Sequence, residues 1–317
     1  MRHNGHPIPT ASSPVQIRPA FSSAFLAIAA LACWLSTATA NAQVPSTATG
    51  TQRDCGEDPP WSKPTPPHRI FGNSWYVGTC GISAVLITSP KGHVLIDAGP
   101  QESPQAVEAN IRALGFKPKD IRIILNTHEH LDHAGGIARL QRDSGAKVLS
   151  RAPSAEALSA GMSDRRDPQF TSTGRFPAVA NVHVLADSTN VTLGPLVIRN
   201  IPSPGHTAGG SSWTWRSCEG AVCHDIVFAD SVTAISDKVY RYSDHPEFVA
   251  AFRNTLATLE ALPCDILITT HPGASNTLDR LDGKAPLVDA GACKAYARHG
   301  REVLEQRLTD ETNGKAP

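Results

Sequence analysis

Residues 121–133 read IRIILNTHEHLDH, an apolar run of strand length followed at once by a histidine-rich segment. Within six residues of that segment, His128, His130, Asp132 and His133 supply three imidazoles and a carboxylate. Imidazole nitrogen and carboxylate oxygen are the ligands that zinc takes at sites that activate water. If a loop here runs into a helix, His128 and His130 point to one side, while Asp132 and His133 serve a second position nearby. The spacing therefore predicts two adjacent metal ions, in preference to a surface histidine cluster or to histidines that cap a helix.

Two further histidines stand at the end of an apolar run, beside glycine or proline. His206 lies in the sequence SPGHTAG, just after the run at residues 196–201, and His271 lies in TTHPG, just after residues 265–268. Loops at strand ends are where a rigid scaffold presents functional groups, so both histidines are candidate ligands. The histidines without such a motif are expected to be structural or solvent-exposed: His68, His183, His224, His245 and His299.

Strand-like and helix-like runs recur twice in the domain expected at residues 69–317, which follows a Pro/Thr/Ser-rich, extended N-terminal arm at residues 43–68. Apolar or alternating runs predict strands at 74–77, 83–88, 93–97, 121–126, 147–149, 182–185, 191–193, 196–201, 211–215, 226–229 and 265–270. Caps and apolar periodicity predict helices at 103–115, 136–142, 247–262 and 294–308. Two packed sheets with helices outside would bury this many apolar strands, so the sequence predicts an α/β fold.

Residues 1–42 have the features of a secretory signal peptide. Basic residues precede an apolar run at 21–35, and small residues up to Ala42 follow it. The run is too short for a membrane span, which takes about 20 apolar residues. We expect cleavage after Ala42, with Ala40 nearly as good, and a periplasmic protein. A lipid-bearing Cys33 is a weaker alternative.

Charge and cysteine content limit the partners of the chain. The 317 residues include 29 Lys+Arg and 29 Asp+Glu, so there is no basic surplus to replace the counterions of a nucleic acid. Without the signal peptide six cysteines remain, and an even number in an exported chain predicts disulfides. Six cysteines can pair in many ways, although Cys218 and Cys223 resemble a local loop staple. No partner-binding stripe is evident, so a monomer is the default expectation.

Four motifs together resemble the metallo-β-lactamase fold superfamily: HxHxDH, the PGHT turn, Ala229-Asp230-Ser231 and the strand-end His271. The sequence LIDAG also matches the early aspartate of that family with Asp97. More narrowly, the chain resembles class B metallo-β-lactamases of the third subclass, which bind two zinc ions through histidine and aspartate without cysteine. The resemblance extends over about residues 70–308. It implies an αβ/βα four-layer sandwich of two mixed β-sheets flanked by helices.

The resemblance also implies which residues bind zinc. The first zinc ion would be held by His128, His130 and His206, and the second by Asp132, His133 and His271. Ser231 stands where another subclass has a cysteine ligand, which supports the third subclass. In related hydrolases such as glyoxalase II, an aspartate in the motif of Asp230 bridges both metals, whereas the third subclass does not count it as a ligand, as we expect here. Asp97 is expected to orient a ligand from outside the metal site.

The implied activity is hydrolysis of the β-lactam ring of penicillins, cephalosporins and carbapenems, which confers antibiotic resistance. A hydroxide that bridges the two metals would attack the lactam carbonyl, with Asp132 as the catalytic residue that orients it. Ser231 and Thr233 are expected to contact the substrate carboxylate, although the commoner family residue at the second position is serine. Gln169 and Phe170, in a polar stretch at residues 151–176, are further candidate contacts, unless this stretch is only a surface loop.

The resemblance narrows the disulfide pairing. It implies Cys264–Cys293, which ties the strand before His271 to the last helix. With Cys218–Cys223 as the local pair, Cys55–Cys80 remains to fasten the N-terminal arm.

Two alternatives stay open. The first is another hydrolase on the same fold, such as a lactonase or a glyoxalase-II-type thioesterase, which would use Asp230 as a metal bridge. The second is an exported, disulfide-bonded zinc protein without catalysis, whose metals would have only protein ligands.

Overall fold

The computed structural model describes residues 54–315, so the signal peptide expected at residues 1–42 lies outside the described part. Its elements are β1 (His68–Phe71), β2 (Ser74–Tyr76), β3 (Val85–Ile87), β4 (His93–Ile96), α1 (Pro104–Ala113), η1 (Pro118–Asp120), β5 (Ile121–Leu125), α2 (Leu131–Ala134), α3 (Ile137–Ser144), β6 (Lys147–Arg151), α4 (Ala152–Ala160), β7 (His183–Leu185), β8 (Asn190–Leu193), β9 (Leu196–Pro202), β10 (Ser211–Glu219), β11 (Val222–Ala229), η2 (Tyr242–Asp244), α5 (Pro246–Ala261), β12 (Ile266–Thr269), η3 (Pro272–Ser275), α6 (Thr277–Leu281) and α7 (Ala292–Thr312). Among residues 54–315, no helix is long and apolar enough to cross a membrane.

The first half of the described chain forms a seven-stranded mixed sheet, with β1 to β7 in sequence order. Strands β1 to β4 pair antiparallel and β4 to β7 pair parallel. Helices α1, α3 and α4 lie in the connections between the parallel strands, as parallel neighbours require. The carboxyl ends of β4, β5 and β6 therefore meet at one edge of this sheet.

The second half forms a five-stranded sheet in the order β12-β11-β10-β9-β8. Strands β8 to β11 pair antiparallel, and α5 connects β11 to its parallel neighbour β12. Strands β9, β11 and β12 consequently run in the same direction and end at the same edge. The β10–β11 hairpin is longer than expected from the sequence and reaches Glu219 and Val222.

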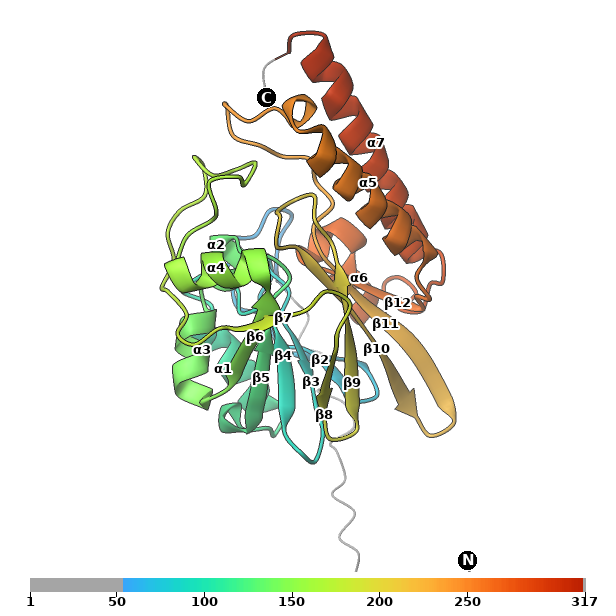
Figure 1. Cartoon of the computed structure of the whole chain (residues 1–317). Helices are drawn as coiled ribbons and strands as arrows, with labels where there is room; N and C mark the ends of the chain where they lie inside the picture. Colours follow the sequence, from blue (N-terminus) through green and yellow to red (C-terminus); the bar gives the residue numbers. More distant parts are fainter. Residues whose placement is uncertain (1–53, 316–317) are drawn as a thin grey trace, which may run out of the picture. The chain divides into compact units, whose positions relative to one another are not determined.

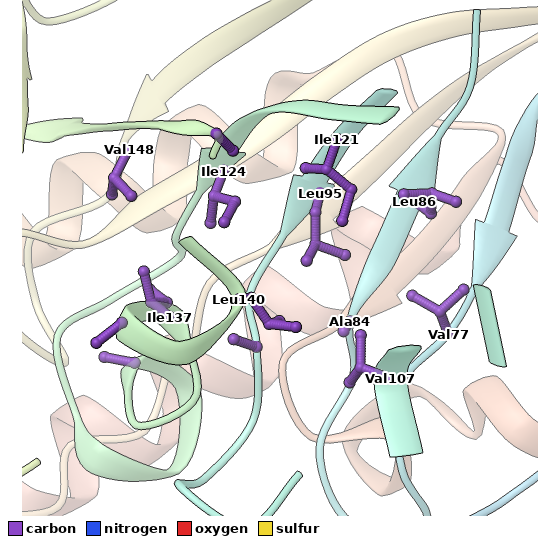
Figure 2. Packing of buried hydrophobic residues seen from close by; sticks show 14 of the residues in the cluster. Val77, Ala84, Leu86, Leu95, Val107, Ile121, Ile124, Ile137, Leu140 and Val148 are labelled. Carbon is purple, nitrogen blue, oxygen red and sulfur yellow. The ribbon is translucent and has the colours of Figure 1, made fainter. Parts of the chain in front are cut away.

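Three apolar clusters lie between four layers of secondary structure, with α1 and α3 on one side of the strands and α5 and α7 on the other (Figure 1). Figure 2 shows Val107 of α1 beside Ala84, and Leu140 of α3 near Leu95 of the seven-stranded sheet. Trp213 and other buried side chains fill the space between the sheets, and Leu304 of α7 belongs to the cluster under α5 and α7. The expected αβ/βα four-layer sandwich is confirmed.

Helix α5 shows why the outer layers form. Pro246 occupies the first turn, where its missing N–H costs no hydrogen bond. Val249, Phe252, Leu256 and Leu259 then recur at intervals of three or four residues and are all buried. Such a stripe places one face of the helix on the sheet and leaves the other in water.

The polar stretch expected at residues 151–176 needs correction, because its first part is the helix α4. The sequence of α4, APSAEALSA, lacks large apolar residues apart from Leu158, so its apolar stripe is weak. Small side chains let the helix lie close to the sheet, with Ser154, Ala155 and Leu158 buried. Only the part from Gly161 onward is a loop.

The six cysteines form the three disulfides that the resemblance implies. Cys55–Cys80 joins the segment before β1 to the loop after β2, and Cys218–Cys223 closes the end of the β10–β11 hairpin. Cys264–Cys293 joins the residues before β12 to the first turn of α7. No cysteine of this set remains free to bind a metal.

Candidate metal centre

The candidate ligands lie in the loops that follow strand ends in both sheets. His128, His130, Asp132 and His133 come after β5, His206 comes after β9, and His271 comes after β12. Because these strands end at the same edge of the sandwich, residues far apart in the sequence can converge there. The centre therefore draws on both sheets, and the inter-sheet core fixes its dimensions.

The segment after β5 is a loop that enters a short helix, as the spacing predicts. His130 has an extended backbone, with φ −75° and ψ 153°, and immediately precedes α2. His128 and His130 thus project from the loop, while Asp132 and His133 belong to the first turn of α2. Two pairs of ligand-type side chains are therefore presented in different directions by six residues of chain.

One group consists of His128, His130 and His206, whose candidate ligand atoms all lie within 4.8 Å of one another. The ring centroids are 4.9 Å apart for His128 and His130, 4.8 Å for His128 and His206, and 4.9 Å for His130 and His206. All three residues are buried. The turn that carries His206 depends on Gly205, because a Cβ at Gly205 would clash with the Phe252 ring.

The other group lies beside the first. Ligand atoms of His128, Asp132 and His133 also lie within 4.8 Å of one another. Nε2 of His271 approaches this group from β12 and is 3.4 Å from both Nε2 of His133 and Oδ2 of Asp132. Unlike the buried His133, the side chain of His271 is 39% exposed. The six residues predicted to bind zinc are thus brought together in two adjoining groups.

Hydrogen bonds outside the first group engage one ring nitrogen of each histidine, so the other nitrogen can face inward. Nδ1 of His128 is 2.8 Å from Oδ1 of Asp230, and Nε2 of His130 is 2.9 Å from Oδ2 of Asp167. Nδ1 of His206 is 3.1 Å from the carbonyl oxygen of Thr233. Such outer acceptors fix the tautomer and orientation of a ligating imidazole.

Asp97 occupies the corresponding position behind the second group. Its Oδ2 is 3.5 Å from Nδ1 of His133, so Nε2 of that ring faces inward. The backbone of Asp97 has a positive φ of 62°, which is unusual for a residue other than glycine. The carboxylate also accepts hydrogen bonds from the amide and hydroxyl of Thr127, each at 2.7 Å. These bonds hold Asp97 at the end of β4 in that conformation.

Asp230 is placed behind His128. One carboxylate oxygen contacts Nδ1 of His128 and the amide of Ser231, both at 2.8 Å. A Cβ at Gly210 would clash with the other oxygen, so the glycine leaves room for this carboxylate. Burial raises the pKa of Asp230 well above its usual value. Asp230 thus contacts the candidate ligand His128 through the ring nitrogen that faces away from the group.

The two groups differ in their acid–base properties without bound metal. Burial lowers the pKa of His128 well below its usual value and that of His206 to about 3, and neighbouring imidazoles act in the same direction. Burial also acts to lower the pKa of His133, but Asp132 and Asp97 outweigh it and raise that pKa to about 10. For Asp132, burial acts to raise the pKa, but His133 and His271 outweigh it and lower it.

The chemistry of these donors fits a divalent cation. Five imidazoles and one carboxylate converge, and the inward nitrogens of His133 and His271 face each other at 3.4 Å. Lone pairs placed this close repel one another unless a proton or a metal ion lies between them. Histidine nitrogen and carboxylate oxygen are ligands that zinc prefers, and the outer hydrogen bonds are those expected around a metal site.

The candidate substrate contacts lie around the centre. Oγ of Ser231 is 2.8 Å from Oγ1 of Thr270, next to His271. Oγ1 of Thr233 is 2.9 Å from Nδ1 of His206. Nε2 of Gln169 is 3.4 Å from Nε2 of His206, so this side chain reaches the first group. The loop from Gly161 onward therefore does extend to the centre.

Two buried carboxylates near the centre are missing from the sequence-based interpretation. Asp167 contacts His130 across 37 residues of chain. Glu129 accepts hydrogen bonds from the hydroxyl of Thr207 at 3.0 Å and the amide of Gly209 at 3.1 Å, which fastens the turn of His206 to the loop of His128. Glu129 lies between two histidines of the motif, which is the only local sign that it supports the ligand loops. Nothing in the sequence around Asp167 indicates its contact with His130.

Comparisons with known proteins show what the chain as a whole is similar to. The family model of the metallo-beta-lactamase superfamily matches residues 77–271. The structure of metallo-beta-lactamase SMB-1 bound to 2-mercaptoethanesulfonate is 49% identical, covers 80% of this chain and 99% of that one, and has a TM-score of 0.76. MEM-A1, a subclass B3 metallo-beta-lactamase isolated from a soil metagenome library, is 42% identical over 81% of this chain and 100% of that one, with a TM-score of 0.78.

A curated relative also matches, over a smaller region. The hydroxyacylglutathione hydrolase of Anaeromyxobacter dehalogenans is 35% identical over 131 residues, which are 41% of this chain and 41% of that protein. The chain thus spans less than half the length of this relative.

Proposed function

The chain belongs to the metallo-β-lactamase superfamily and has a subclass B3 enzyme among its structural neighbours, and from this premise we propose that it hydrolyses the β-lactam ring of antibiotics with two zinc ions. The observation that carries the proposal is the pair of adjoining ligand groups made only of histidine and aspartate. Ser231 supports it, because a serine at this position provides no thiolate ligand. The likeness to SMB-1 extends over 99% of that chain, which supports the same conclusion.

The outer hydrogen bonds support an assignment of the ligand atoms. His128 and His206 would bind the first zinc ion through Nε2, and His130 through Nδ1, because their other nitrogens are engaged. Asp132, His133 and His271 would bind the second, with Nε2 of both histidines. Zinc in such a site lowers the pKa of bound water to about 7 and polarises a substrate carbonyl.

Asp132 is the proposed catalytic residue. Its carboxylate oxygen Oδ2 lies 3.1 Å from Nε2 of His133 and 3.4 Å from Nε2 of His271. Since these histidines lower its pKa, the carboxylate remains ionised and can accept a hydrogen bond from the attacking water. Orientation of the water by a fixed acceptor brings it into line with the lactam carbonyl before reaction.

Substrate recognition is assigned to groups on either side of the centre. Ser231 and Thr233 would bind the carboxylate of the substrate through their hydroxyls, and Gln169 would contact its amide from the opposite loop. Thr233 also lies against His206, so its hydroxyl is shared between ligand orientation and substrate binding. Ser231 has no such second duty toward a histidine and is therefore the stronger carboxylate contact.

A lactonase or glyoxalase-II-type thioesterase is the alternative activity, and the curated relative gives it weight. That alternative would use Asp230 as a bridge between the metals. The hydrogen bond between Oδ1 of Asp230 and the outer nitrogen of His128 instead supports the lactamase. A zinc protein without catalysis is disfavoured by the partial exposure of His271, which leaves the second group accessible to substrate.

The proposed compartment is the periplasm, reached through cleavage of residues 1–42. Three disulfides support an oxidising environment, because such bonds are rare in proteins of the cytosol. Export would place the enzyme, as a monomer, where β-lactams act. Antibiotic resistance is the expected consequence.

Turnover of a chromogenic cephalosporin by the zinc-loaded protein tests the proposal. We expect hydrolysis that a chelator abolishes and added zinc restores. An acyl homoserine lactone and a glutathione thioester serve as comparison substrates at the same enzyme concentration. Absence of cephalosporin turnover would contradict the lactamase, faster turnover of either comparison substrate would support the alternative, and turnover that resists the chelator would contradict the metal.

A further inference from the structure

Two loops flank the metal centre, one after α4 and one after β11. The first, residues 161–176, carries Gln169, and the second, residues 230–241, carries Ser231 and Thr233. Thr171 of the first loop and Asp237 of the second are 66 residues apart in the sequence. The contacts between the two loops depend on Asp237.

Asp237 forms hydrogen bonds to both loops at once. Its Oδ2 accepts hydrogen bonds from the amide of Thr171 at 2.9 Å and from the hydroxyl of Thr171 at 2.7 Å. Its amide donates to the carbonyl of Pro168 at 2.8 Å. Its Oδ1 accepts from the amides of Val239 and Tyr240, both at 2.9 Å, which holds the turn of its own loop.

The loop of Asp237 is itself fixed to helix α7. Arg307 donates hydrogen bonds to Oγ of Ser236 at 2.5 Å and to the carbonyl of Tyr240 at 3.3 Å. The carboxylate of Glu311 accepts hydrogen bonds from the amides of Tyr242 at 3.0 Å and Ser243 at 2.7 Å. Asp237 therefore projects from a segment that is braced from behind.

The loop of Gln169 is fixed at two points on either side of that residue. On one side, Oδ1 of Asp167 accepts a hydrogen bond from the amide of Gln169 at 2.7 Å, while Oδ2 contacts His130 at 2.9 Å. On the other side, the amide of Thr171 is held by the side chain of Asp237, whose own amide also bonds back to the carbonyl of Pro168. Without the carboxylate of Asp237, the loop would keep its contacts at Asp167 and Gln169 but lose the one at Thr171, so the segment after Gln169 would be held less firmly.

We propose that Asp237 is a positioning residue that clasps the two loops together and so holds Gln169 at the distance from Ser231 and Thr233 that the substrate requires. The substrate contacts rest on the proposed function. The clasp, by which we mean the hydrogen bonds that Asp237 makes to Pro168 and Thr171, does not. Fixing a contact residue before binding increases affinity, since less conformational entropy is lost when substrate binds. Asp237 thus acts on the Michaelis constant through Gln169, without touching the reacting atoms.

The carboxylate cannot be replaced by an amide in this position. Both oxygens of Asp237 face backbone N–H donors, so the side chain of the Asp237→Asn variant would have to turn its NH₂ group toward one set of them. Burial acts to raise the pKa of Asp237, but the amide and hydroxyl of Thr171 and the two amides of its own loop outweigh it and lower the pKa to about 2. The clasp is therefore ionised at any pH at which the protein is expected to work.

A double-mutant cycle between Asp237 and Gln169 tests the proposal, with zinc content measured for each protein. In the wild-type background, Asp237→Asn should raise KM for the cephalosporin about tenfold and change kcat by less than about threefold, with zinc content unchanged. In the Gln169→Ala background, the same substitution should change KM by less than about twofold, because the residue that it positions is gone. Equal effects in the two backgrounds would show a general structural function and overturn the proposal.

Thr171→Val and Asp164→Asn provide a milder variant and a matched control. Thr171→Val removes only the hydroxyl bond to Asp237 and should raise KM about threefold, so it tests the clasp even if Asp237→Asn folds poorly. Asp164 lies in the same loop and caps the amide of Arg166 at 2.8 Å without reaching the other loop. Asp164→Asn should leave KM unchanged, and a rise equal to that of Asp237→Asn would overturn the proposal.

Hydrogen exchange separates failure of the clasp from failure of the proposed function. Exchange at the amide of Thr171 should accelerate about tenfold in Asp237→Asn, irrespective of the reaction that the protein catalyses. Unchanged exchange would overturn the clasp even in an active lactamase. If exchange is faster in Asp237→Asn but the wild-type protein does not hydrolyse cephalosporin, the clasp is supported and the lactamase is contradicted.

Discussion

The two ligand groups of the metal centre differ in how far the surrounding protein buries and fixes their side chains. In the first, each of His128, His130 and His206 is buried, and each has its outer nitrogen held by a carboxylate or a carbonyl. In the second, Nδ1 of His133 lies 3.5 Å from Oδ2 of Asp97, whereas His271 is 39% exposed, and within residues 54–315 no side chain bonds to its Nδ1. The first group is thus preorganised, and the second keeps one ligand free to adjust.

This difference follows from the location of the groups. The first group lies where three loops converge over the inter-sheet core, so neighbouring side chains surround every ring. The second lies toward the side where the segment before β1 passes, with the ring of Trp61 centred 6.3 Å from that of His271. We therefore expect the first group to determine whether zinc is bound at all, and the second to determine how readily it is exchanged.

Removal of a first-group ligand should have the largest effect. His130→Ala deletes one of three ligands and leaves Asp167 buried without its partner, so the first zinc ion should be lost and kcat/KM should fall about a thousandfold. Metal analysis and cephalosporin hydrolysis measure the two outcomes. His183→Ala, at an exposed position of β7, is the control and should retain both zinc and activity. Full activity of His130→Ala would show that the ligand assignment is wrong.

Removal of the exposed ligand should have a smaller effect. His271→Ala leaves Asp132 and His133 in place, so zinc in the second group should bind more weakly while the first group remains filled. Activity should fall roughly tenfold to a hundredfold, as is typical when a metal site is weakened rather than abolished. Zinc titration followed by activity measurement tests this, with His299→Ala on the exposed face of α7 as the control. A loss as large as that of His130→Ala would remove the distinction between the groups.

The subtlest expected difference is in the number of protons that each zinc ion displaces when it binds. Because the pKa of His133 is raised to about 10, this residue carries a proton at neutral pH that zinc must displace. Affinity for the second zinc ion should therefore rise as the pH increases toward about 10, by up to about tenfold per unit, and level off above it. His128 and His206 have lowered pKa values and are already neutral, so these two release no proton when the first zinc ion binds. Calorimetry in buffers of different ionisation enthalpy measures the protons released, and equal release at both steps would contradict this difference.

The sequence predicted most of the candidate site because most of it is local. The spacing of His128 to His133 depends only on a loop that enters a helix, and His206 and His271 each follow an apolar strand beside glycine or proline. The resemblance to the third subclass, carried by these same motifs, is confirmed by the structural neighbours. The two-sheet architecture was predictable for a similar reason, since each sheet requires a series of short apolar strands.

Contacts between distant loops could not be predicted in this way. Asp167 and Asp237 are unremarkable in their local sequence, and their partners lie 37 and 66 residues away. Helix α4 was missed because alanine, serine and proline give it a weak apolar pattern, although burial against the sheet holds it in place. In each case the tertiary structure supplies the partner that defines the function of the residue.

Both ligand groups combine residues from the two sheets, with His206 and His271 from one and the others from its neighbour. A zinc ion bound in either group would therefore cross-link the two sheets of the sandwich. Because metal bound only by the folded state adds its binding free energy to stability, zinc supply would set the resistance of this protein to heat and proteolysis as well as its activity. A cell starved of zinc would then lose the protein itself, and an apparent loss of catalysis would partly reflect the loss of folded chains.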